Sequence, residues 1–403
     1  MAFDTGPIVR ANLRNKTGPM LIAIQIALTL AVLVNAVFII QQRVEKITRP
    51  TGMDVDNIIT VQSVGIGDGF DMPSSVREDV AALESIPGVI AATPSQHVPL
   101  SGSGWGTEMK ASAETDAPRE NAVQYFMTEH WMEALGVKLE SGRTFAAEDI
   151  DYPEQFGEVP DSIIITRAFA DALFPDGDAQ PGVTLYNGLN DPMTVIGIVE
   201  QMHGAWVGWD KLGNVMIVPT VMPIDYIYYL IRTEPGQRDR IMPQVEETLV
   251  ALNDQRLIKD LKPHAEYKED SYMGDRGMAI LLSVVVGLMM VVTGVGIVGL
   301  ASFSVRQRVK QIGTRRAVGA RRGAIVRYFM LENWLITTAG VLLGTVLAVG
   351  VNYWLVVSYE LERLNPVYVP VGILALWAIG LLAVAWPARR AAAISPAVAT
   401  RTI

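Results

Sequence analysis

Five side chains are of types that could support hydrolytic or metal chemistry. His97, His130, His203 and His264 are scattered, without the HExxH or paired spacing that brings zinc ligands together. Ser103 has glycines directly beside it, whereas a nucleophile elbow needs them two positions away. The carboxylates follow no pattern, which favours a solvated acidic surface. We therefore predict no catalytic residue, no metal site and no enzymatic activity in this chain.

Nucleotide and thiol chemistry are excluded more directly. The sequence contains no Gly-Lys pair, so it cannot form a P-loop that cradles phosphates. It contains no cysteine, which excludes disulfides, thiol catalysis and cysteine-based zinc sites. The net charge of −9 gives no reason to expect a nucleic-acid partner. We predict that the chain itself binds no cofactor.

Positive charge gathers instead between residues 304 and 328. Val305, Val309, Ile312 and Val318 keep helical spacing there, and Gly319 suits the left-handed position that ends a helix. The pattern predicts a short amphipathic helix, basic on one side and apolar on the other. The basic residues are Arg306, Arg308, Lys310, Arg315, Arg316, Arg321, Arg322 and Arg327.

This basic segment lies between stretches that are apolar enough to span a membrane. Half of the residues are apolar and only 19% are charged. Four runs approach the length of about 20 apolar residues that a bilayer requires. They are residues 20–40, 277–303, 329–357 and 368–386. The first is too long for the core of a cleavable signal peptide and is expected to be retained.

The distribution of charge predicts the topology. Lys and Arg exceed acids in residues 1–19, 304–328 and 387–403, and such segments stay in the cytoplasm. The acidic region 41–276 is then extracytoplasmic, and 358–367 is a short outer loop. Both termini are expected inside a bacterial inner membrane, with the large domain in the periplasm.

Region 41–276 alternates β-like and helical patterns. Its first and last parts are expected to form two halves of one α+β unit, with a β-rich insertion at about 105–220. The polar stretch 259–276 is expected to be a stalk helix that continues into the second membrane span. The predicted fold class is therefore an integral membrane protein with four transmembrane helices, one plus three, and an inserted α+β domain.

Five further residues could carry contacts. Trp206 and Trp209 lie beside glycines in a loop, where they would either contact a partner or pack beneath their own loop. Glu332 lies one turn inside the membrane and is expected to pair with Arg327 or with a neighbouring helix. Gly340 and Gly344 form a GxxxG pattern, which permits close helix packing but also occurs by chance in membrane helices.

The arginine-rich segment and its continuation resemble the FtsX-type permease domain of MacB-type ABC transporters. The resemblance rests on Ile312-Gly313, Arg316-Ala317-Val318-Gly319-Ala320, Arg321-Arg322 and Glu332, and on the closing segment from Pro387 to Arg401. It continues more weakly across 20–276. Gln311 departs from the pattern, because that family has glutamate before Ile-Gly.

The resemblance implies a non-catalytic permease that passes movement from ATPase subunits to its outer domain. Residues Ile312, Gly313, Arg315, Arg316, Ala317, Val318 and Gly319 would dock on the ATPase. Because only residues 1–19 precede the first span, two copies of a separate ATPase chain carrying ATP and Mg are expected. A second permease copy or a paralogue, and a periplasmic adaptor with a TolC-like outer-membrane channel, are implied partners. The expected cargo is a peptide or antibiotic.

Two alternatives remain open within the same family. FtsX itself regulates cell-wall enzymes, but such relatives carry a smaller outer domain. Lipoprotein-releasing permeases also have large outer domains. The protein that co-purifies with the chain would distinguish these three functions. An export permease is expected to retain a periplasmic adaptor, a regulator a cell-wall hydrolase, and a lipoprotein-releasing permease a bound lipoprotein.

Overall fold

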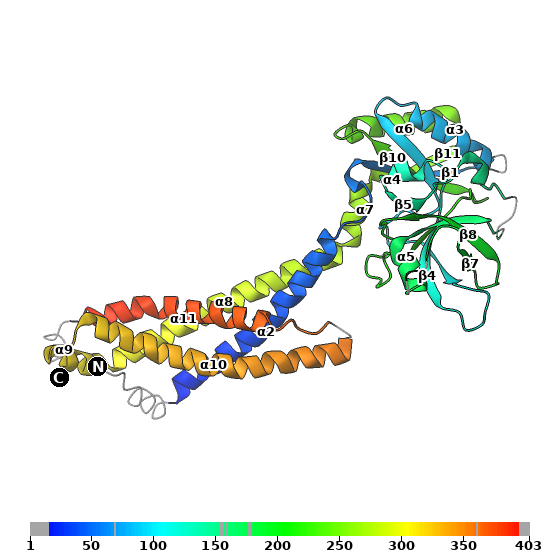
Figure 1. The fold of residues 1–403 in the computed structure, drawn as a ribbon. Helices are drawn as coiled ribbons and strands as arrows, with labels where there is room; N and C mark the ends of the chain where they lie inside the picture. The colour runs from blue at the N-terminus through cyan, green and yellow to red at the C-terminus, as the bar shows by residue number, and fades with distance from the viewer. Residues whose placement is uncertain are drawn as a thin grey trace. The chain divides into compact units, whose positions relative to one another are not determined.

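The computed structural model describes residues 16–67, 70–153, 157, 159–175, 177, 179–359 and 362–394. They divide into two compact units, which we call the membrane unit (up to Thr48 and from Asp275) and the α+β unit (Arg49–Gly274) (Figure 1). Parts of the expected segments 1–19, 358–367 and 387–403 lie outside the described residues.

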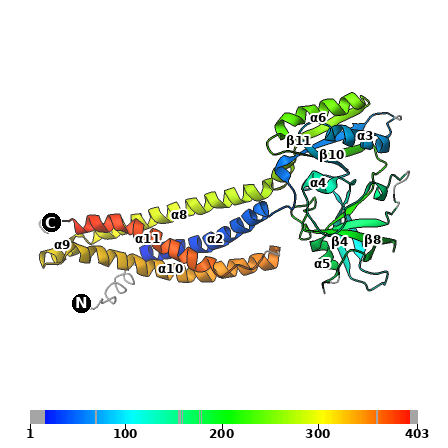
Figure 2. The same ribbon diagram turned by 45° about the horizontal axis from the view of Figure 1, so that its top comes forward.

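The membrane unit contains four long apolar helices that run alongside one another (Figure 2). They are α2 (Thr17–Thr48), α8 (Met273–Gln307), α10 (Arg322–Tyr359) and α11 (Tyr368–Ala392). Each is longer than its apolar run, because polar residues at the ends continue the helix. In α2, 61% of the most apolar window is buried, against 17% in α8, so α2 lies inside the bundle while α8 keeps an exposed face.

The α+β unit contains a four-stranded antiparallel sheet in the order β11-β1-β10-β2. Its strands are β1 (Ile58–Gly65), β2 (Val89–Ser95), β10 (Tyr226–Thr233) and β11 (Arg256–Pro263). Helices α3 (Met72–Glu84) and α6 (Arg238–Leu252) pack together on this sheet (Figure 1). Strands from the two ends of the region are thus joined in one sheet.

The chain between β2 and β10 forms a second sheet, in the order β5-β8-β6-β9-β4-β3-β7. Because β7 also pairs with β8, this sheet closes on itself as a small barrel. Its strands are β3 (Trp105–Lys110), β4 (Arg119–Phe126), β5 (Leu139–Gly142), β6 (Ser162–Thr166), β7 (Thr184–Tyr186), β8 (Pro192–Val199) and β9 (Val215–Val218). Two short helices accompany them, α4 (Trp131–Leu135) and α5 (Arg167–Leu173).

Side-chain alternation gives the barrel two buried faces. In β4, Ala122 and Phe126 belong to the cluster that also contains Phe169 of α5. Val123 and Tyr125 belong to the larger cluster shared with the four-stranded sheet. The period of two in a strand therefore supplies both cores of the unit.

The predicted stalk at 259–276 is only partly helical. Lys259 lies in β11, which pairs with β1, so the prediction of helix was wrong up to Pro263. Helix α7 (His264–Ser271) follows, and Tyr272 separates it from the start of α8 at Met273. Cross-strand pairing with a segment far away in the sequence outweighed the helix-compatible polar pattern.

Candidate functional site

The basic segment forms a short helix, α9 (Val309–Ala317), between α8 and α10. Arg308 occupies the turn before it. After the helix, Gly319 takes φ +98°, with Ala320 N–H donating to Arg315 O and Gly319 N–H to Arg316 O. This is the glycine-dependent motif that ends helices. The helix ends at Ala317, so Val318 and Gly319 lie in the turn rather than in the predicted helix.

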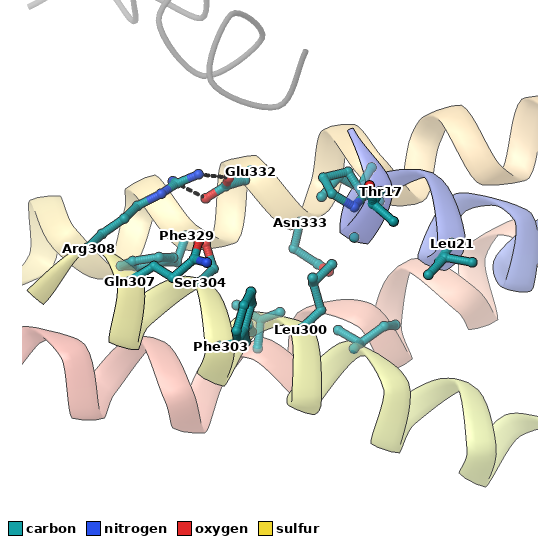
Figure 3. Close-up of a pocket in the computed structure, with 16 residues that line it drawn as sticks. Thr17, Leu21, Leu300, Phe303, Ser304, Gln307, Arg308, Phe329, Glu332 and Asn333 are labelled. Atoms are coloured by element: carbon teal, nitrogen blue, oxygen red, sulfur yellow. Dashed lines mark hydrogen bonds and ion pairs between the residues drawn. The ribbon is translucent and has the colours of Figure 1, made fainter. Parts of the chain in front are cut away.

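Arg308 fixes the start of α9 to α10. Its Nη1 and Nη2 each donate to one carboxylate oxygen of Glu332 at 2.9 Å (Figure 3). Nη1 also donates to the hydroxyl of Tyr328 at 2.9 Å. Glu332 is buried, and a paired geometry of this kind is what a buried carboxylate requires.

The partner of Glu332 is therefore Arg308, and the prediction of Arg327 was wrong. Residues three or four apart share a helix face, whereas Arg327 lies five positions before Glu332 in α10. The alternative was a partner on a neighbouring helix, and Arg308 instead occupies the turn between α8 and α9. Sequence reasoning missed Arg308, because only the reversal of the chain through α9 brings it to Glu332.

Arg316 fixes the end of α9 to α11. Its Nη1 donates to the carbonyl oxygens of Ala392 at 2.6 Å and Ile394 at 3.2 Å. These carbonyls lie at the C-terminus of α11, where unpaired acceptors and the helix dipole favour a cation. Movement of α9 would therefore act on two membrane helices.

The predicted docking residues divide between two faces. Ile312 and Gly313 are buried against the membrane helices, and Arg316 bonds α11. Arg315, Ala317, Val318 and Gly319 are exposed. Val318 is 84% exposed, so its predicted place on the buried apolar stripe was wrong, because it follows the last turn of α9.

Gly340 and Gly344 face α2. A Cβ added to Gly340 would lie 2.8 Å from Ile26 Cβ, and one added to Gly344 would lie 2.9 Å from Leu30 Cβ. Both positions thus require the small residue for close approach of α10 and α2.

The loop that carries Trp206 and Trp209 packs against the core of the α+β unit and is hydrogen-bonded within that unit. Trp206 and Trp209 lie edge to face, with ring centroids 5.7 Å apart, and are partly buried against the larger core. Arg49 donates from Nη2 to Val207 O at 2.5 Å and from Nε to Tyr272 Oη at 3.0 Å. This arginine therefore bonds the loop and the residue between α7 and α8.

The histidines do not assemble. Among the described residues, no group of three or more His, Cys, Asp or Glu could hold a metal ion. Burial, with smaller effects from Arg49 and Lys268, lowers the pKa of His203 to about 4. Burial and Lys262 lower the pKa of His264 to about 4 as well. Both are neutral groups of the protein interior.

Two family descriptions match the chain. The MacB-like periplasmic core domain matches residues 20–263, and the FtsX-like permease C-terminal region matches residues 283–396. The chain belongs to the MacB-like, FtsX-type family of ABC transporter permeases. The extracytoplasmic α+β domain and the four helices are accordingly those of such a permease.

Curated relatives of this permease are longer proteins. It is 29% identical to the macrolide export ATP-binding/permease protein MacB of Chromobacterium violaceum over 65% of the chain and 40% of that protein. The MacB proteins of Azoarcus sp. (27% identity, 80% and 47% coverage) and Acinetobacter baylyi (25%, 85% and 51%) match more of the chain. The chain spans about half the length of these relatives.

Solved structures show similarity to about half of this chain. The periplasmic region of MacB from Actinobacillus actinomycetemcomitans is 16% identical, with a TM-score of 0.32, over 52% of this chain and 90% of that one. The extracellular domain of the transporter YknZ from Gram-positive bacteria is 17% identical, with a TM-score of 0.32, over 50% and 100%.

Proposed function

We propose that this permease transmits movement from an ABC ATPase on a separate chain to its α+β unit and thereby exports a substrate. ATP and Mg would bind the ATPase, since the sequence contains no P-loop of its own. The α+β unit would lie in the periplasm, with α9 and both termini in the cytoplasm of a bacterial cell.

The observation that carries this proposal is the two-ended attachment of α9. Arg308 and Arg316 bond the helix to α10 and α11, respectively. Arg315 of α9 and Val318 in the turn directly after it are both exposed. The C-terminal end of α9 thus presents an apolar and a basic residue to which another protein could bind. Because α9 is attached at both ends, its movement would be transmitted to α10 and α11.

The relatives supply the expected cargo and assembly. Proteins named for macrolide export match most of this chain, so we propose an antibiotic or peptide as substrate. Two permease copies, or one copy with a paralogue, would carry two ATPase subunits. A periplasmic adaptor and a TolC-like channel would complete the route out of the cell.

The test uses the full chain co-expressed with a candidate ABC ATPase from the same genome. We expect the double variant Arg315→Glu, Val318→Asp to recover at least about tenfold less ATPase, because a central interface contact is worth about 2 kcal/mol. Arg316 is left unchanged, because reversing it would detach α9 from α11. Arg363→Glu, an exposed residue between α10 and α11, is the control. Undiminished recovery of the ATPase with normal membrane insertion would refute docking at α9.

A further inference from the structure

A cavity of about 270 Å³ lies within the membrane unit, beside the Arg308–Glu332 pair (Figure 3). Its walls come from the first turn of α2, the end of α8, the first half of α10 and one residue of α11. Leu300, Phe303 and Ile336 make much of the lining apolar. The cavity is at the small end of ligand pockets, large enough for a headgroup or the start of one chain rather than a whole lipid.

Asn333 adds an uncharged polar side chain to the lining of the cavity. It is 8% exposed and lines the cavity. Its side-chain amide carries both donors and an acceptor. A ligand with acceptor and donor atoms could therefore form hydrogen bonds with it in the cavity.

The neighbouring Arg308–Glu332 ion pair determines which charges a ligand of the cavity should carry. Glu332 accepts one hydrogen bond at each carboxylate oxygen, so each oxygen retains capacity for a second donor. Arg308 uses one donor of Nη2 toward Glu332, and a guanidinium has five N–H donors in all. The pair is neutral in sum and presents an anion beside a cation. A zwitterion is the complementary ligand.

We propose that this cavity binds the headgroup of a phospholipid with a primary ammonium, that is, phosphatidylethanolamine. The ammonium would donate to Glu332 and to the Asn333 carbonyl oxygen, while the phosphate would accept from Arg308. The acyl chains would leave along Leu300 and Phe303 toward the bilayer. The bound lipid would thus stabilise the arrangement of the end of α8, the start of α9 and the first half of α10. This inference depends on the helices spanning a membrane, not on the ATPase partner.

The test measures lipid retention by the full chain with native mass spectrometry. The purified protein is equilibrated with equal amounts of phosphatidylethanolamine, phosphatidylcholine and phosphatidylglycerol. We expect about tenfold more ethanolamine lipid than choline lipid, because a choline group cannot donate the charge-assisted hydrogen bond to Glu332. Retention of phosphatidylglycerol through the basic residues alone would fall with added salt.

Variants separate the cavity from the general surface. Ser304→Phe fills the cavity and should abolish retention of ethanolamine lipid, whereas Ser302→Phe, two residues away on α8 and outside the lining, should not. Asn333→Leu should reduce retention, and Glu332→Gln should remove the preference for ethanolamine over choline. Equal retention of the three lipids by the native chain would overturn the proposal, as would unchanged retention in Ser304→Phe. Monodisperse elution of each variant shows that it is folded.

Discussion

Arg308 and Arg316 stand at the two ends of α9, yet each is engaged within the chain. Arg308 neutralises a carboxylate inside the membrane unit, and Arg316 meets carbonyl oxygens at a helix end. Both tasks follow from the cost of leaving charge or backbone acceptors unpaired away from water. Composition alone could not separate these structural arginines from exposed ones such as Arg315, because all carry the same charge in one short segment.

His264 shows burial acting on a single residue of the α+β unit. It is fully buried, with Nδ1 3.1 Å from the hydroxyl of Thr60. Its pKa of about 4, against an ordinary 6.5, means that the unfolded chain binds more protons between these values. The contribution to stability is complete above pH 6.5 and is lost as the pH falls toward 4.

We predict that His264→Gln flattens this pH dependence. The free energy of unfolding of residues 49–274 should fall between pH 6.5 and 4 by about 3 kcal/mol less in the variant than in the native sequence. Denaturant titrations followed by tryptophan fluorescence measure this difference.

His130→Gln is the matched control. Burial acts to lower the pKa of His130, but its hydrogen bond and ion pair with Glu84 raise it above the ordinary value. Removing His130 should therefore not reduce the loss of stability on acidification. An unchanged pH slope in His264→Gln would contradict the account of His264 as a neutral buried group.

At the scale of elements, polar and small residues join the membrane helices. Thr29 of α2 and Thr293 of α8 share a hydrogen bond of 2.8 Å. Asn35 of α2 donates to Ala348 O of α10 at 3.1 Å. The glycines of α10 allow α2 to approach along the same side. Hydrogen bonds and close packing replace the hydrophobic effect between helices in lipid.

We predict that Gly344→Leu destabilises the membrane unit by about 1–3 kcal/mol or more, because the new side chain would overlap Leu30 and Ala27. Gly350→Leu on the same helix is the control, since a Cβ there meets nothing within 4 Å. Thermal unfolding of the purified full chain should show a lower midpoint for the first variant only. Equal midpoints would mean that α10 and α2 are not packed closely at Gly344.

The sequence was informative where a pattern is local. A run of apolar residues identifies a membrane helix, and Gly319 identifies the end of α9, because each depends on neighbouring residues. Lys259 in β11 and the pairing of Glu332 with Arg308 depend on partners far away in the chain. Val318 was misplaced because its spacing matched the stripe of α9 although the helix ends before it.

At the scale of the whole molecule, α8 carries a regular apolar face that the described bundle leaves uncovered. Leu281, Val284, Leu288, Val291 and Val295 of α8 are all exposed, and we call them the α8 seam. Their spacing alternates between three and four residues, the heptad spacing by which two helices pack along each other. We propose a second copy of the permease as the partner for this seam, because the same face of two copies could pack together about a two-fold axis.

The absence of cysteine from the sequence makes this face directly testable. Leu288 is 61% exposed on the seam, whereas Val286 is 8% exposed and faces the bundle. Leu288→Cys should form a covalent dimer under mild oxidation in membranes, because a two-fold axis along the seam brings equivalent residues together. Val286→Cys should remain monomeric on the same gel. Covalent dimers from both variants would indicate random collision in the bilayer. If the permease co-purifies as a dimer but Leu288→Cys does not cross-link, the interface lies on another helix.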